Sequence, residues 1–168
     1  MTSISLATLN AMDADTFIAT LGEIFEHSPW VPAQAYPARP FADVATLHAT
    51  MVALVSHAGD EPQLALLRAH PELAQRGPLT DASKSEQTNM GLNELAADEA
   101  ETLTTLNAAY RARFGFPFII AVRGQRDRNA IITALRTRLA NTESQERLTA
   151  LAEVAKIARF RLDDLIGD

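Results

Sequence analysis

Apolar residues recur at helical spacing along most of this chain, and that periodicity limits the folds it can adopt. Between Asp13 and Ser28 the apolar side chains that share one helix face are Phe17, Leu21, Ile24 and Phe25. The same pattern recurs in four longer segments, at residues 42–59, 97–115, 127–142 and 142–167. Two of these segments finish at Gly59 and Gly115, because glycine readily adopts the left-handed conformation that ends many helices. The sequence therefore predicts a mainly α-helical protein.

Proline and a short apolar run interrupt the helical pattern. A helix from Asp60 should end at Ala69 or His70, since a proline follows. Four prolines between residues 28 and 41 rule out a long helix there. The run Phe116–Val122, FPFIIAV, is too short and too uniformly apolar for an exposed segment, which predicts a buried extended stretch. With a further helix near Ser83, the expectation is about seven helices and no sheet.

The length and composition favour one compact domain. A chain of 168 residues buries roughly two thirds of the surface that its unfolded form exposes. Hydrophobic residues make up 47% of the chain and charged residues 21%, which is ordinary for a globular protein. No repeat, linker or low-complexity segment divides it. We therefore expect a single all-α domain over residues 1–168.

Charge and cysteine content exclude several classes of function. The chain has 15 Lys and Arg against 21 Asp and Glu, and a net charge of −6 disfavours binding to nucleic acid or to anionic membranes. The absence of cysteine excludes disulfides and thiolate chemistry. No secretory signal or membrane-spanning run is recognisable, so we expect a cytoplasmic protein.

Metal ions and nucleotide cofactors have no support in the sequence. The histidines show none of the i, i+4 pairings that set two imidazoles on one helix face; they are His27, His48, His57 and His70. Glycine-rich phosphate-binding loops are also absent. We expect neither a metal nor a cofactor.

His70 is the first candidate for chemistry. It precedes Pro71, so its backbone is biased towards an extended conformation and its imidazole is placed at a break in the chain. The simpler interpretation is that His-Pro-Glu ends one helix and starts another, with Pro71 and Glu72 in the new first turn. The residues alone favour that simpler interpretation.

The segment from Ser83 to Gln87 allows two interpretations as well. Ser83 and Glu86 have the Ser-x-x-Glu spacing of a capping box, which needs no function. Hydroxyls, a carboxylate and unpaired N–H groups at a helix start also suit a polar or anionic ligand. Capping boxes are common, so the structural interpretation again leads.

Two further candidates lie in the second half of the chain. The Gly-Phe-Pro interruption before Phe118 leaves backbone groups without regular partners, which a ligand could supply. Arg161 either clamps a substrate carboxylate or pairs at the surface with Asp163 or Asp164.

Taken in order, four motifs resemble the 2-oxo-4-hydroxy-4-carboxy-5-ureidoimidazoline (OHCU) decarboxylase family: RAHPELA, LTDASKSEQ, LNAAYRARFGFPFIIAV and EVAKIARFRLDDL. The likeness covers essentially the whole chain and outweighs the simpler interpretation of each motif. The family implies an all-helical fold, a homodimer, and a small-molecule enzyme without a cofactor. Its reaction is the last step from urate to (S)-allantoin.

The resemblance also assigns roles to residues. His70 becomes the catalytic acid/base and Glu86 its carboxylate partner, while Pro71 lines the substrate site. The remaining substrate-binding positions are Ser83, Lys84, Ser85, Glu86, Gln87, the backbone of Phe118, Ile119, Ile120, Ala121 and Val122, and Arg161. The sequence departs from the family pattern at Gln75, where members usually have glycine, and at Asn89-Met90 before Gly91.

Two other functions stay open at this point. A helical binding or adaptor module would use His70 only as a helix terminator. A related decarboxylase would act on a different ureido or imidazoline acid.

Overall fold

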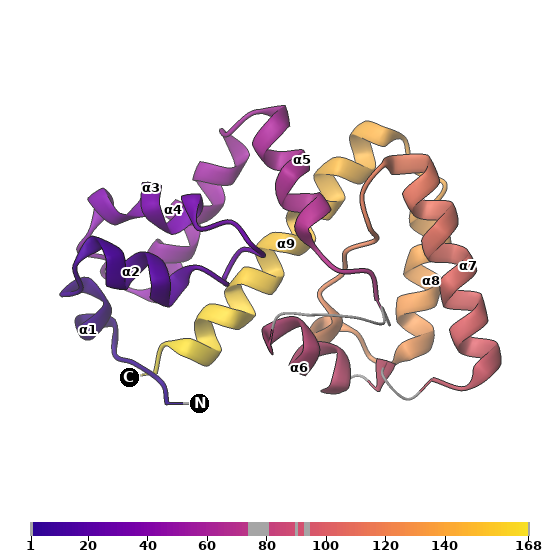
Figure 1. The fold of residues 1–168 in the computed structure, drawn as a ribbon, viewed down its shortest axis with the longest axis horizontal. Helices are drawn as coiled ribbons and strands as arrows, with labels where there is room; N and C mark the ends of the chain where they lie inside the picture. The colour runs from indigo at the N-terminus through magenta and orange to yellow at the C-terminus, as the bar shows by residue number, and fades with distance from the viewer. Residues whose placement is uncertain (1, 74–80, 90, 93–94, 168) are drawn as a thin grey trace. The chain divides into compact units, whose positions relative to one another are not determined.

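The computed structural model describes residues 2–73, 81–89, 91–92 and 95–167 (Figure 1). Within these ranges the chain forms nine α-helices and no strand, which confirms the predicted all-α fold. Residues Ile4 and Ile166 form an isolated parallel bridge. None of the described helices is long and apolar enough to cross a membrane.

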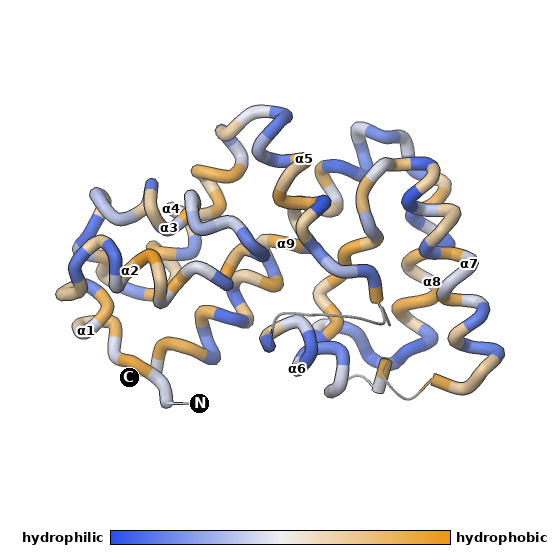
Figure 2. The backbone as a smooth tube through the Cα atoms, viewed as in Figure 1, coloured by the Kyte–Doolittle hydropathy of each residue, from blue (hydrophilic) through white to orange (hydrophobic). Residues whose placement is uncertain are grey.

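The helices follow one another in a simple order. They are α1 Leu6–Asn10, α2 Ala14–Leu21, α3 Trp30–Ala35, α4 Val44–Ser56, α5 Asp60–Ala69, α6 Asp81–Asn89, α7 Ala97–Phe114, α8 Arg128–Arg138 and α9 Glu143–Leu165. The 3₁₀ turns η1 Tyr36–Ala38 and η3 Val122–Gly124 also lie between helices. Hydrophilic and hydrophobic residues alternate within single helices, as expected of amphipathic helices (Figure 2).

The chain divides into two compact units. Unit 1 comprises Met1–Leu66 and Ala155–Asp168, and unit 2 comprises Leu67–Val154. Helix α9 contributes its first half to unit 2 and its second half to unit 1. The single domain expected over residues 1–168 stays a prediction.

Aspartate caps begin two helices of unit 1. Asp13 accepts a hydrogen bond from the backbone N–H of Thr16 at 2.8 Å, and Asp43 accepts one from Thr46 at 2.7 Å. These bonds satisfy N–H groups that the first helical turn leaves without partners. Because the bonds favour the charged carboxylate, hydrogen bonding with Thr16 and Thr46 lowers the pKa of both aspartates.

Helix α2 is shorter than the sequence predicts. The helical pattern extended to Ser28, but α2 ends at Leu21 with Gly22 as its C-cap. Glycine has a low helix propensity, which explains an end at this point. Ile24 and Phe25 are nevertheless buried, so the apolar pattern correctly predicts which residues are buried even after the helix has ended.

The proline-rich segment forms short elements, as the sequence predicts, and packs on α2. Phe17 lies 5.4 Å from the Tyr36 ring and 6.4 Å from the Phe41 ring, between ring centroids. The guanidinium of Arg39 covers the Tyr36 ring at 3.5 Å and donates to the carbonyl of Asn10 at 2.7 Å. These contacts fix a segment that has little regular hydrogen bonding of its own.

Unit 2 contains the predicted extended segment. Helix α7 ends at Gly115, whose φ of 77° is left-handed as expected of a glycine C-cap. Residues 117–121 then form no helix or strand, and Phe116–Val122 are all buried. The buried extended stretch is therefore confirmed. At the start of helix α9, Thr142 and Gln145 exchange hydrogen bonds of 3.0 and 3.2 Å, the reciprocal pattern of a capping box.

The prediction of about seven helices missed two short ones. Helices α1 and α3 contain 5 and 6 residues, fewer than two turns. An apolar stripe needs more than that length to show its period, so periodicity does not detect such helices.

Candidate functional site

His70 lies immediately after α5 and is almost buried. The residue is only 6% exposed, and its backbone N–H donates to the carbonyl of Leu67 at 3.3 Å. Pro71 has no N–H and stops the helix at this point. Pro71 and Glu72 are partly exposed and not helical, so the expectation that they begin a new helix is wrong. The imidazole is thus carried at a chain break rather than in a helical turn.

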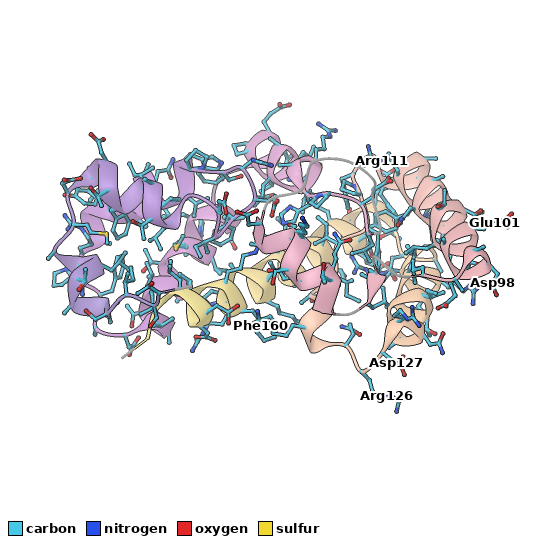
Figure 3. All side chains as sticks on the ribbon, turned by 60° about the horizontal axis from the view of Figure 1, so that its bottom comes forward. Asp98, Glu101, Arg111, Arg126, Asp127 and Phe160 are labelled. Carbon is cyan, nitrogen blue, oxygen red and sulfur yellow. The ribbon has the colours of Figure 1, made fainter. Side chains whose placement is uncertain are left out.

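The segment after His70 is held against α7 by a hydrogen bond and an ion pair. The amide of Asn107 donates to the carbonyl of Leu73 at 3.1 Å, and Glu72 pairs with Arg111 at 2.7 Å. Asn107 is 5% exposed, whereas Arg111 lies at the surface of α7 (Figure 3). Sequence reasoning missed both α7 residues. The signal was available for Asn107, a polar residue at a buried position of an apolar helical stripe.

Helix α6 separates the predicted binding residues by face. Ser83 and Gln87 are 4% and 7% exposed and lie one turn apart, which places them on one buried face. Glu86 is partly exposed beside them, while Lys84 and Ser85 are exposed.

Ser83 does not cap this helix. Helix α6 begins at Asp81, so Ser83 is already inside the first turn and the predicted capping box with Glu86 is wrong. The sequence pattern identified a helix start correctly to within three residues. It misassigned the role of the serine because Ser-x-x-Glu spacing also occurs within a first turn.

Two of the predicted motifs meet in unit 2. Helix α6 packs against η3, whose first residue is Val122. The five predicted binding positions Phe118–Val122 are each at most 5% exposed. The motif that carries Ser83, Glu86 and Gln87 therefore adjoins the end of the apolar extended segment.

Arg161 belongs to unit 1 and is buried there. Its Nη1 donates to Glu26 Oε2 at 2.8 Å and to the carbonyl of Glu23 at 2.9 Å. The side chains of Arg161 and Glu26 are 6% and 1% exposed. Surface pairing with Asp163 is wrong, because Asp163 pairs with Arg159 at 2.9 Å. Sequence reasoning missed Glu26, although an acidic residue directly after buried Ile24 and Phe25 was a usable signal.

The described residues contain no group of three or more His, Asp or Glu side chains placed to hold a metal ion. Two of the departures from the family pattern, Gln75 and Met90, lie outside the described residues, and so does the side chain of Asn89.

Comparison with known proteins gives matches along almost the whole chain. A family model described as OHCU decarboxylase matches residues 10–163. The OHCU decarboxylase of Haloferax volcanii is 45% identical over 162 residues, which is 96% of each chain. That of Xenopus laevis is 40% identical and covers 96% of this chain and 94% of its own. A uric acid degradation bifunctional protein of Bacillus sp. (strain TB-90) is 43% identical over 97% of this chain but only 32% of its own length.

Solved structures share the fold. A crystal structure of (S)-allantoin synthase superposes with a TM-score of 0.76 at 32% identity, over 97% of this chain and 54% of that one. A crystal structure of OHCU decarboxylase in the presence of (S)-allantoin has a TM-score of 0.73 at 23% identity, over 89% and 99% of the two chains. The family model over residues 10–163, together with relatives that are 40–45% identical over nearly their whole length, establishes that the chain belongs to the OHCU decarboxylase family.

Proposed function

We propose that this protein decarboxylates OHCU to (S)-allantoin and CO₂, the last step of urate degradation to allantoin. The observation that carries the proposal is 45% identity to an OHCU decarboxylase over 96% of both chains. The all-helical fold that it shares with the solved structures is consistent with this assignment.

The chemistry of the substrate explains why the reaction needs little from the protein. The carboxylate and a hydroxyl share one ring carbon, next to a ring C=N. When the bond to the carboxylate breaks, its electron pair passes into that C=N and CO₂ leaves. The ring nitrogen that receives this pair takes up a proton. The resulting planar enol then loses its hydroxyl proton and accepts a proton on the adjacent ring carbon, the former carbon of the C=N. The substrate is its own electron sink, so the enzyme's work is binding and proton transfer.

His70 is our candidate for the proton transfer. An imidazole has an ordinary pKa of about 6.5, so it exchanges protons readily near neutral pH. Its place at a chain break, with the following residues fixed by Asn107 and Arg111, supports a defined orientation. An imidazole fixed on one face of the planar enol delivers the proton from one side, which yields one enantiomer. We assign Glu86 as its carboxylate partner.

The remaining assignments concern substrate binding. Pro71 lines the site, α6 supplies Ser83, Lys84, Ser85, Glu86 and Gln87, and the extended segment supplies the backbone of Phe118, Ile119, Ile120, Ala121 and Val122. The buried face of α6 beside η3 supports this for Ser83 and Gln87. The assignment of Arg161 rests on the family resemblance. We also propose that the protein is cytoplasmic and forms a homodimer. Light scattering after gel filtration, which measures the molar mass in solution, tests for the dimer.

The activity is tested by making the unstable substrate from urate with the two upstream enzymes. Its ultraviolet absorbance reports the decay, and circular dichroism reports the handedness of the allantoin. The wild-type protein should accelerate the decay and yield the (S) enantiomer. Decay at the uncatalysed rate with racemic product would refute the function and favour a non-catalytic adaptor. Faster turnover of another ureido or imidazoline acid would favour a related decarboxylase.

The role of His70 is tested by substitution. General acid–base catalysis contributes about 10²–10⁴ in rate, so His70→Ala should lower kcat by a factor in that range. His57→Ala is the matched control, because His57 is exposed and its Nδ1 contacts only the carbonyl of Ala53 among the bonds described, at 2.8 Å. Normal activity in a folded His70→Ala protein would remove His70 from the mechanism while leaving the function in place.

A further inference from the structure

A buried polar cluster lies under the extended segment in unit 2. Arg138 Nε donates to Glu146 Oε1 at 2.6 Å, and Tyr110 donates its hydroxyl to the same oxygen at 2.6 Å. Asn141 donates to the second carboxylate oxygen at 2.9 Å. The side chains of Arg138 and Glu146 are 9% and 0% exposed. We call Tyr110, Arg138, Asn141 and Glu146 the arginine cluster.

The arginine cluster touches the extended segment at two neighbouring residues. Arg138 Nη1 donates to the carbonyl of Ile119 at 2.6 Å. The guanidinium carbon of Arg138 lies 4.5 Å from the centre of the Phe118 ring, and the Tyr110 ring meets that ring edge-on at 5.4 Å. One guanidinium thus joins a carboxylate on α9 to a main-chain carbonyl in a segment without helix or strand.

Such a cluster is a costly way to stabilise a core. Removing a guanidinium and a carboxylate from water carries a desolvation penalty, and apolar residues of similar size are often as stabilising or more so. What the ion pair adds is a fixed direction, since the planar guanidinium donates along set axes. Burial, and then the hydrogen bond to Glu146, raise the pKa of Tyr110, so its hydroxyl remains a donor throughout the neutral range.

Fixed direction matters at this segment more than elsewhere. Residues 117–121 have no ladder or helical turn to set their carbonyl and N–H directions. The proposed function uses the backbone of Phe118–Val122 to hold the substrate ring. A displacement of about 1 Å in a positioning group can cost about 100-fold. Where that group binds the ground state and the transition state equally, the loss raises KM and leaves kcat unchanged.

We propose that Arg138 is a positioning residue that fixes the Ile119 carbonyl and thereby the substrate-binding backbone of Phe118–Val122. The inference rests on the proposed function. Arg138 acts through the main chain and does not touch the substrate. Glu146, which Tyr110 also binds, orients Arg138 in turn, so the determinants of ring binding extend beyond the predicted binding residues to α7, α8 and α9.

The first test is Arg138→Lys in the full chain. Lysine keeps the charge opposite Glu146 but has no planar fork to bind Glu146 and the Ile119 carbonyl together. A loosened backbone weakens binding of ground state and transition state alike, so KM should rise about tenfold to 100-fold while kcat changes little. Arg136→Lys on the same helix is the control, because Arg136 is exposed, and its KM should equal that of the wild type.

A purely structural role predicts a different pattern. If Arg138 only stabilises the fold, Arg138→Lys lowers the melting temperature and the apparent kcat through loss of folded enzyme, with KM unchanged. That result would overturn the inference. An inactive wild type would instead refute the proposed function, so the two failures are distinguishable.

A second variant covers the case in which lysine prevents folding. The triple change Arg138→Met, Glu146→Met and Tyr110→Phe replaces the buried charges with apolar groups, a type of exchange that proteins often tolerate. It also removes the hydrogen bond to Ile119. Binding of (S)-allantoin, measured by calorimetry, should weaken about tenfold or more relative to wild type if position is what Arg138 supplies. Unchanged binding would overturn the inference.

Discussion

Two arginines on α9, two positions apart, form ion pairs that should differ in strength by several kcal/mol. Arg161 pairs with Glu26 at 2.8 Å, and the two side chains are 6% and 1% exposed. Arg159 pairs with Asp163 at 2.9 Å, and these side chains are 43% and 46% exposed. Both pairs have near-identical distances, so any difference in their contribution comes from burial.

The matched perturbations are Glu26→Gln and Asp163→Asn, which each replace a carboxylate with an amide of the same size. Breaking a buried ion pair costs about 3–5 kcal/mol because the remaining charge is stranded away from water. The amide oxygen introduced by Glu26→Gln can still accept one hydrogen bond from Arg161, so we expect a loss near the lower limit, about 3 kcal/mol. An exposed i, i+4 pair contributes only about 0.3–0.5 kcal/mol.

Thermal denaturation measures the difference. In a protein of this size, 1 kcal/mol shifts the melting temperature by about 2–4 °C, so Glu26→Gln should lower it by about 6–12 °C. Asp163→Asn should lower it by less than about 2 °C, and that small effect should shrink further in high salt. Equal shifts for the two variants would refute the argument that burial makes the Glu26 pair strong.

Three further predictions concern caps and a buried amide. Gly115→Ala should destabilise the protein by about 1–2 kcal/mol in urea denaturation, because a φ of 77° is strained for alanine although the space around the residue is open. Gly124→Ala is the control, because Gly124 has open space and no positive φ, and this variant should not destabilise the protein. Because the pKa values of Asp13 and Asp43 are lowered, the stabilising contribution of these carboxylates is complete above about pH 4 and is lost as the pH falls through the folded-state pKa. The double variant Asp13→Asn, Asp43→Asn should therefore lose less stability in acid than the wild type. Superimposable curves of stability against pH would contradict this. Asn107→Ala should cost about 1–3 kcal/mol, since the buried carbonyl that it binds loses its donor, and a stability within error of wild type would contradict that role.

The sequence predicted the longer elements well because their signals are local. Asp43, Asp127 and Thr142 each cap the helix expected after them, and Gly115 ends α7 as expected. Such caps depend on a few neighbouring residues, so no tertiary information is needed to identify them. The same reasoning failed at Ser83, where spacing alone does not distinguish a cap from a position inside the first turn.

The supporting residues of the site were not predictable in the same way. His70 and Ser83 are candidates because of their motifs, and their roles stay predictions. Asn107, Arg138 and Glu146 form contacts with residues distant in sequence. Arg138 reaches the carbonyl of a residue 19 positions earlier, and nothing in the local pattern of α8 indicates that partner. A charged residue within the apolar stripe of a helix indicates that its side chain is buried, but which residue it pairs with depends on the tertiary structure.

The way unit 1 is assembled bears on how this protein is made. That unit joins Met1–Leu66 to Ala155–Asp168, whereas unit 2 is one continuous stretch. On a ribosome, all of unit 2 is synthesised before the last segment of unit 1. Phe17 finds its aromatic neighbours Tyr36 and Phe41 within residues 1–66, but unit 1 is complete only when Ala155–Asp168 have been synthesised. The unit whose synthesis begins first is therefore the last to have all of its residues.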